Sequence, residues 1–333
     1  MKTFFVRNFY ILLGSSFIVG VLLASCINSV FFDGEIKQTQ AIYVDAYPVD
    51  VAPFKPSQSF WLGTDTNGRH LLHVIIEGAK YTIGLGLFIA IFRMFFSCVL
   101  GTIYALYLQK YQRVLSALSN AFQYIPVVLL AYFLLRPVLN QAFEGFQYSF
   151  ATRVWYEIIL LILLALPTVS LVIGNEISII LRKEFIQSAK TLGASSFFIL
   201  RKHVIVHIYR RLLIIFTQQV IQVLLILAHL GLFELYLGGT KIDYSIMKAA
   251  PITTTYEWSG LIGDYFDLFI VYPWIPLVPI GAFTLTIFSL NLIVKGLEKN
   301  MNSEPATQTK RLKQKDIKKV ALKEFNFKVV TRD

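Results

Sequence analysis

The chain carries little charge for its length. Only 15% of its 333 residues are Asp, Glu, Lys or Arg, against 56% that are hydrophobic, and the mean hydropathy is +0.61. A soluble domain usually has about 25% charged residues, so this scarcity excludes the ordinary soluble class. Only two cysteines occur, Cys26 and Cys98, both inside apolar stretches. A disulfide scaffold or a cysteine metal site needs more, and we interpret both as packing residues.

Motifs that would supply energy or chemistry are also missing. The sequence contains no GxxxxGK[ST] phosphate-binding loop, no cluster of metal ligands at useful spacing, and no Ser, His and Asp set that could lie at one depth. We therefore predict no catalytic residue, no metal site and no cofactor in this chain. Energy for any work it does must come from a partner.

Long apolar runs, in contrast, are abundant. A helix of roughly 20 apolar residues crosses about 30 Å of hydrocarbon. We predict an all-α integral membrane protein with six transmembrane helices, at residues 9–32, 81–108, 114–135, 155–181, 212–237 and 269–294. The predicted organisation is an N-terminus and first span (1–32), an extracytoplasmic loop (33–80), a five-helix core (81–296) that contains a cytoplasmic loop (182–211), and a basic cytoplasmic tail (297–333).

Positive charge gathers in two segments beside these spans. The loop 181–211 has seven Lys or Arg against one acid, and the tail 297–333 has ten against five, which accounts for the formal net charge of +11. Basic residues beside spans mark the cytoplasmic side. We therefore predict that the loop, the tail and both termini are cytoplasmic, and that nucleic acid is not a partner. The tail has two interpretations, a solvated segment or a contact with anionic lipid or a partner.

The N-terminus also has a second interpretation. Lys2 and Arg7, an apolar run and then Leu23-Ala24-Ser25-Cys26 look like a signal peptide that ends at a lipidated cysteine. The apolar run continues to Phe32, however, whereas the apolar part of a signal peptide is typically about 7 to 15 residues. We therefore favour a first span over a cleaved signal.

The basic loop predicts a helical hairpin. Glu184 to Leu192 can form one short helix that Gly193 ends in a left-handed conformation. The segment Ala194-Ser195-Ser196 offers the N-cap of a second helix over 197–211. Apolar side chains would then project among the cations: Ile186, Leu192, Phe197, Phe198 and Ile199. Such a hairpin suits a groove on a partner, and the alternative is a surface helix without a partner.

Three motifs carry a family resemblance. Gln187-Ser188-Ala189, followed by Gly193 and Ile199, resembles the EAA loop of permease subunits of bacterial ATP-binding-cassette (ABC) importers. The segment 62–69, LGTDTNGR, resembles the LGTDxxGRD signature of the C-type subunit of oligopeptide and dipeptide permeases. The segments 258–262, 272–274 and 291–297 resemble the last outer loop and span of that subunit. The resemblance covers about residues 5 to 300.

The chain also departs from this family pattern. Gln187 and Ser188 stand where the pattern has Glu and Ala, Val206 stands near the expected Pro, and His70 replaces an Asp. A glutamine can still form a hydrogen bond but cannot form an ion pair. Coupling in a divergent member of this kind would depend more on the glycine, the apolar side chains and the flanking cations.

The resemblance implies a type I ABC importer permease, in a bacterial inner membrane, that imports peptides. Implied partners are a homologous B-type permease, two cytoplasmic ABC ATPases that bind ATP and Mg²⁺, and an extracytoplasmic substrate-binding protein. The implied ATPase-coupling residues are Glu184, Gln187, Ser188, Ala189, Gly193, Phe197 and Ile199. The alternatives are another cargo such as nickel or an antimicrobial peptide, a secondary transporter that needs no ATP, and a scaffold or sensor that does not transport.

Ionisable residues inside the predicted spans are further candidates for the translocation pathway. Arg93 lies near the middle of the second span, where an arginine costs at least about 2.5 to 3.5 kcal/mol. It should therefore face a cargo carboxylate, the partner permease, or a structural partner such as Glu176 or a carbonyl. His229 and Glu234, five residues apart, share no tight helical face and either line the pathway or pack.

Glu176 lies near the cytoplasmic end of the fourth predicted span. It is close in sequence to Arg182 and Lys183, and we expect it to pair with one of them.

Overall fold

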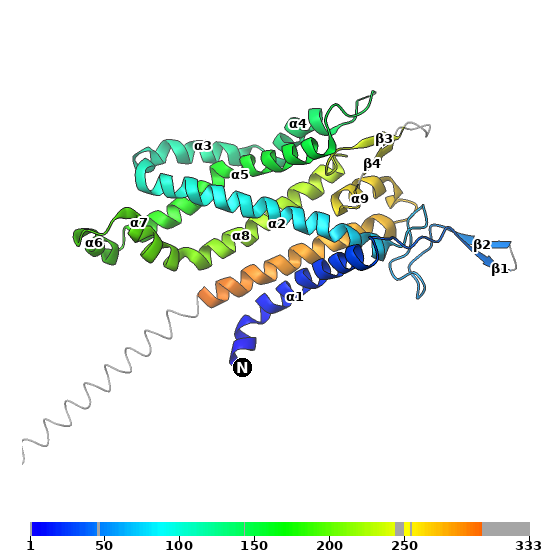
Figure 1. The fold of residues 1–333 in the computed structure, drawn as a ribbon, viewed down its shortest axis with the longest axis horizontal. Helices are drawn as coiled ribbons and strands as arrows, with labels where there is room; N and C mark the ends of the chain where they lie inside the picture. Colours follow the sequence, from blue (N-terminus) through cyan, green and yellow to red (C-terminus); the bar gives the residue numbers. More distant parts are fainter. Residues whose placement is uncertain (1, 45–46, 143, 244–249, 254, 302–333) are drawn as a thin grey trace, which may run out of the picture.

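The computed structural model describes residues 2–44, 47–142, 144–243, 250–253 and 255–301. Long helices lie side by side, with loops and short strands at one end and a helical hairpin at the other (Figure 1). We call these the loop end and the hairpin end. Among the described residues, five helices are long and apolar enough to cross a membrane: Asn8–Phe31, Leu71–Phe122, Phe150–Leu181, Ser196–Leu232 and Trp274–Met301. The predicted all-α membrane class is confirmed.

The first predicted span is one continuous helix, α1 (Lys2–Phe31). Its part nearest the loop end is joined to α2 (Leu71–Ile103) by polar contacts. The Ser25 hydroxyl donates to the Glu77 carbonyl and accepts from the Lys80 amide, each at 3.2 Å. Between the two helices, β1 (Ala41–Val44) and β2 (Tyr47–Val51) form an antiparallel hairpin. α2 begins at Leu71 rather than at residue 81, so the helix includes the end of the predicted loop.

The third predicted span, 114–135, is not a single helix. After α2 the chain reverses direction through a π-helix, η1 (Tyr104–Leu108), and a 3₁₀ helix, η2 (Gln109–Tyr111) (Figure 1). It returns as two helices, α3 (Gln112–Tyr124) and α4 (Val127–Leu139). Ile125, which separates them, is extended, with φ −88° and ψ 123°. Pro126 disfavours a helical conformation at the residue before it, so the prediction of one continuous span here was wrong.

Two long helices lead to and from the hairpin. α5 (Phe150–Leu181) runs to the hairpin, which contains α6 (Glu184–Thr191) and α7 (Ser196–Ile199). A π-helix, η3 (Leu200–Val204), continues α7 directly into α8 (Ile205–Leu232). The second arm of the hairpin is therefore the start of a span and not a separate surface helix.

The remaining elements close the loop end and return the chain to the hairpin end. They are β3 (Lys241–Asp243) and β4 (Ala250–Ile252), which pair antiparallel, α9 (Trp258–Tyr265), a 3₁₀ helix η4 (Phe266–Phe269) and the C-terminal helix Trp274–Met301. The Asn300 side chain donates to the Asn8 side chain at 2.8 Å, so Asn8 and Asn300 lie at the same end of the bundle. Most of the predicted basic tail, 302–333, lies outside the described residues.

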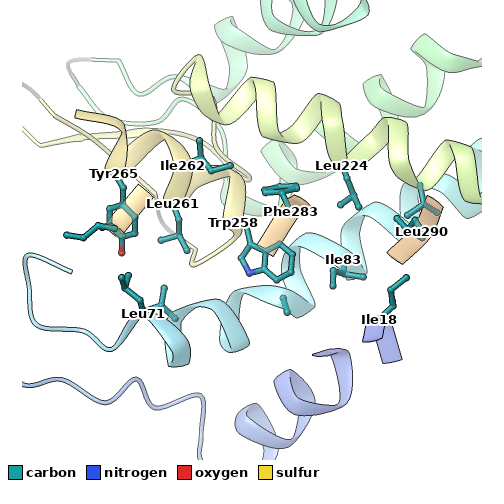
Figure 2. Close-up of a cluster of buried hydrophobic side chains, with 14 of the residues drawn as sticks. Ile18, Leu71, Ile83, Leu224, Trp258, Leu261, Ile262, Tyr265, Phe283 and Leu290 are labelled. Carbon is teal, nitrogen blue, oxygen red and sulfur yellow. The ribbon is translucent and has the colours of Figure 1, made fainter. Parts of the chain in front are cut away.

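Trp258 organises the apolar core below the loop end (Figure 2). Its ring meets Phe283 of the C-terminal helix edge-on, with centroids 5.7 Å apart. Its backbone amide donates to the Thr82 hydroxyl, and its indole N–H donates to the Ile75 carbonyl, both at 2.9 Å. Both N–H groups of this buried residue are therefore paired with α2 residues, and these bonds hold α9 against α2.

Candidate functional site

The hairpin, residues 184–211, folds around a glycine turn. α6 begins at the predicted Glu184 and ends at Thr191. Gly193 follows with φ +88°, and the amide of Ala194 bonds back to the Ala189 carbonyl at 3.1 Å. Ser195 caps the second arm, because its hydroxyl accepts from the Phe198 amide. The sequence predicted both features, a glycine that ends the first helix and a serine that caps the second.

The apolar side chains of the hairpin divide into two sets. Leu192 and Phe197 are 88% and 73% exposed, and Phe198 is also exposed. Ile186 and Ile199 are instead fully buried, against the ends of α5 and α8. The prediction that all five project toward a partner was therefore wrong for Ile186 and Ile199. These two anchor the hairpin, which leaves Leu192, Phe197 and Phe198 as its exposed apolar tip.

The residues at the EAA positions bond within the hairpin. The side-chain amide of Gln187 donates to the Leu181 carbonyl at 3.0 Å. Carbonyls in the last turn of a helix such as α5 have no partner within the helix, and this bond supplies one. The Ser188 hydroxyl donates to the Glu184 carbonyl at 3.1 Å. Glu184, Gln187 and Ser188 are exposed and Ala189 is half-buried, so this surface of α6 is open in the single chain.

Two polar links join the helices beside the hairpin. Arg182 donates to the Gln109 side chain at 3.1 Å, and Gln109 in turn donates to the Ser178 hydroxyl of α5. Glu176 pairs with Arg211 at 2.9 Å, joining α5 to α8. The expected pairing of Glu176 with Arg182 or Lys183 was therefore wrong, because the fold brings α8 alongside the end of α5.

A pocket of about 810 Å³ lies within the spans, where α3 gives way to α4. Its walls also include α5 near Pro167, the middle of α8, Arg93 of α2 and Asn291 of the C-terminal helix. Broken and proline-containing helices within the spans are typical of membrane proteins in which irregular backbone lines a cavity. The helix break that contradicts the third predicted span is thus part of the pocket wall.

Arg93 is the one charged residue among the described residues that line this pocket. It is 1% exposed, and its Nε and Nη2 donate to the Leu161 carbonyl at 2.9 and 2.5 Å. Of the partners that the sequence left open, a carbonyl within the chain is therefore the one observed, and Glu176 is not involved. The bond holds the guanidinium between α2 and α5, at the edge of the pocket.

The polar lining of the pocket was missed in the sequence. Gln218, Gln219 and Gln222 of α8 line it, together with Thr168 of α5. The signal was available, because three glutamines within five residues of an apolar span are costly unless they face protein or water. The sequence does not indicate which residues of α2, α3, α4 and α5 complete the pocket with these glutamines.

His229 and Glu234 lie outside this lining. His229 is exposed on α8, and its Nδ1 lies 2.5 Å from the Leu225 carbonyl. It follows Gln218, Gln222 and Leu225 at helical spacing, so it extends the same face toward the loop end. Glu234 follows the end of α8 with φ +59° and is exposed. The structure does not bring these two side chains together with Arg93.

The LGTDTNGR segment forms a hydrogen-bonded turn around Asp65 at the loop end. The buried Asp65 carboxylate accepts from the amides of Asn67 and Arg69 at 2.9 and 2.8 Å, and from Arg69 Nε at 2.6 Å. It also accepts from the Tyr265 hydroxyl of α9 at 3.1 Å. His70, at the position of the expected Asp, has its pKa lowered by burial and by nearby Lys37 and His73. Through Asp65 and Tyr265, this segment therefore joins the first loop to α9.

Glu257 and Asp264 are two further carboxyl groups with polar partners at the loop end. Glu257 accepts from the Leu237 amide at 3.1 Å, from the Thr253 hydroxyl at 2.9 Å and from the Thr255 hydroxyl. Burial raises the pKa of Glu257 to about 7, although these hydrogen bonds oppose the shift. Burial also raises the pKa of Asp264 to about 7, against a backbone bond from Thr253. Both groups hold the segment before α9 in place.

The long apolar helices, with a pocket between them, are those of a multi-pass membrane protein. The family described as "Binding-protein-dependent transport system inner membrane component" matches residues 96–303, more than half of the chain. The chain therefore belongs to this family of inner membrane transport components.

Individual relatives align with a longer part of the chain than the family model does. The chain is 28% identical to the peptide transport system permease protein SapC of Escherichia coli O6:H1, over 72% of this chain and 73% of the relative. It is 22% identical to the glutathione transport system permease protein GsiD of Shigella dysenteriae serotype 1, over 73% and 71%. A chain of the MetNI methionine ABC transporter, in an inward-facing form, aligns with a TM-score of 0.46 and 16% identity, over 68% of this chain and 97% of that one.

Proposed function

We propose that the chain is the permease subunit of an ATP-driven importer of peptides and forms half of the translocation pathway. Membership of the binding-protein-dependent family carries this proposal. The relatives' names specify peptide and glutathione transport, and glutathione is itself a short peptide. The pocket inside the spans, which contains amide, hydroxyl and guanidinium groups, supports a pathway through the bundle.

The hairpin is the proposed contact with two cytoplasmic ABC ATPases, which would bind the ATP and Mg²⁺ that drive transport. Its exposed apolar tip of Leu192, Phe197 and Phe198 lies among cations, and an apolar centre with a charged rim suits a protein groove. Glu184, Gln187, Ser188 and Ala189 lie beside this tip on α6. Gly193 sets the turn between the two arms.

The remaining partners follow from the two ends of the bundle. The basic hairpin and the ends near Asn8 and Asn300 would face the cytoplasm, since basic residues beside spans favour that side. The loop end would then meet an extracytoplasmic binding protein. A homologous B-type permease would complete the pathway and cover the exposed polar face of α8 that carries Gln218, Gln222 and His229.

Affinity purification of the tagged chain in mild detergent tests these partners. Two ATPases and a second permease should co-purify with it, and the ligand of the co-purified binding protein should be a peptide. A nickel ion or an antimicrobial peptide as that ligand would instead favour the alternative cargoes. Transport in proteoliposomes that contain this chain and no ATPase would contradict the proposal in favour of a secondary transporter.

The tip itself is tested by the double variant Leu192→Ser and Phe197→Ser. Each apolar side chain buried in an interface contributes about 1.5 to 3 kcal/mol, so we expect at least a tenfold loss of ATPase association. The matched control is Ile270→Ser, because Ile270 is also an exposed apolar residue but lies at the loop end. If the double variant and the control retain the ATPases equally, the tip is not the contact.

A further inference from the structure

The pocket has polar groups on several walls but no acidic group. Amides come from Gln218, Gln219, Gln222 and Asn291, and one hydroxyl comes from Thr168. Of the described residues that line it, Arg93 is basic and none is acidic. The charge of this surface is therefore positive, with neutral groups that can both donate and accept hydrogen bonds.

One of these amides is buried without a partner. Gln219 is 5% exposed, and its Oε1 has no hydrogen-bond partner among the described residues. A buried acceptor of this kind is destabilising unless a donor reaches it. Because Gln219 lines the pocket, a bound molecule with N–H groups can supply that donor.

The same pocket contains two positively charged features, the Arg93 guanidinium and the N-terminus of α4. Arg93 donates twice to the Leu161 carbonyl, but the described residues provide no carboxylate to neutralise it. Val127, the first residue of α4, also lines the pocket, and the N-terminus of α4 has no side-chain cap. A helix N-terminus and a guanidinium both favour a negative group.

We propose that this pocket binds cargo through carboxylate and main-chain amide groups and disfavours cargo with a net positive charge. This inference rests on the proposed function and specifies the chemistry of its pathway. A peptide provides both groups, since its carboxylate can approach Arg93 and its N–H groups can approach Gln219. A divalent metal ion or a strongly cationic peptide would meet like charge and no carboxylate on this half of the pathway.

The test uses the whole transporter, with its partner permease, ATPases and binding protein, in proteoliposomes. The probes are the tripeptides Ala-Glu-Ala, Ala-Ala-Ala and Ala-Lys-Ala, which differ in net charge. The variant is Gln222→Glu, which places a carboxylate in the pocket while the binding protein stays unchanged. We expect the uptake ratio of Ala-Lys-Ala to Ala-Glu-Ala to rise about tenfold over wild type.

The matched control is Leu232→Glu, which adds the same carboxylate to an exposed position at the end of α8, outside the pocket. The control should leave the ratio unchanged. If Gln222→Glu fails to assemble, Gln218→Glu takes its place, because Gln218 is also an exposed residue of the lining.

The two proposals fail in different ways. Normal ATP-dependent uptake with an unchanged ratio in the pocket variant would overturn the charge selectivity and leave the proposed function standing. A wild-type complex that moves none of the three peptides in the presence of ATP would overturn the proposed function, and this inference with it.

Discussion

Glu257 shows how one side chain can make the loop end sensitive to pH. Its carboxyl group joins the turn after α8, through the Leu237 amide, to Thr253 and Thr255 before α9. It is fully buried, so its charged form is disfavoured, and its pKa rises from 4.5 to about 7. Deprotonation near neutral pH therefore places a charge in the segment that positions Trp258.

The raised pKa predicts the direction of a stability change. Because the folded-state pKa exceeds the unfolded value, the contribution is fully present below about pH 4.5 and is lost as the pH rises through about 7. We expect the melting temperature of the chain in nanodiscs to fall between about pH 5 and pH 8. Glu257→Gln, which keeps an acceptor without a charge, should remove part of this fall, and Asp264, whose pKa is also raised to about 7, contributes to what remains.

Glu35→Gln is the matched control, since Glu35 is an exposed acid of the first loop and its loss should leave the profile unchanged. A wild-type chain whose melting temperature is constant over this range would contradict the prediction.

At the scale of elements, the hairpin was predictable because its boundaries are set locally. Gly193 and Ser195 determine where α6 ends and α7 begins, and both signals are contained in the sequence. Which side of α6 is buried depends on packing against α5 and α8. For that reason Ile186 and Ile199 could not be distinguished from Leu192 and Phe197 before the structure was known.

The third predicted span illustrates a different limit. Its composition is apolar throughout, and apolar length alone predicts a continuous helix. Pro126 was the local signal for a break, but a proline can also lie inside an unbroken helix, as Pro167 does in α5. The pocket depends on bringing α2, α4, α5 and α8 together, and no local signal specifies that arrangement.

The turn of the hairpin gives a prediction that separates backbone conformation from side-chain crowding. A β-branched residue at the φ of +88° of Gly193 is strongly disfavoured. A Cβ there would meet no neighbour within 4 Å, so the effect would come from the backbone alone. We expect Gly193→Val to reduce substrate-stimulated ATP hydrolysis by at least tenfold while membrane insertion persists.

The control is Gly84→Val, since Gly84 also has open space around it but lies in the regular helix α2. Equal ATP hydrolysis in the two variants would show that the left-handed turn is not needed for coupling.

In the molecule as a whole, α5 and α8 join the hairpin to the pocket. Both helices begin or end at the hairpin, and both contribute pocket residues farther along, Thr168 from α5 and Gln219 from α8. Buried Ile186 and Ile199 fix the hairpin to these two helices. A movement of the hairpin would therefore reach the pocket walls through packed helices instead of through a flexible loop.

The ion pair between Glu176 and Arg211 provides a test of that transmission, because it joins α5 to α8 where the hairpin ends. The pair is partly exposed, so its contribution to stability is at most about 1 kcal/mol, and melting temperatures should change little. If the helices must move together, Glu176→Arg or Arg211→Glu should lower the number of peptides moved per ATP about fivefold, the equivalent of about 1 kcal/mol. The double variant, which exchanges the two charges, should restore the ratio. Single variants that transport with the wild-type ratio would show that α5 and α8 need no polar link at this depth.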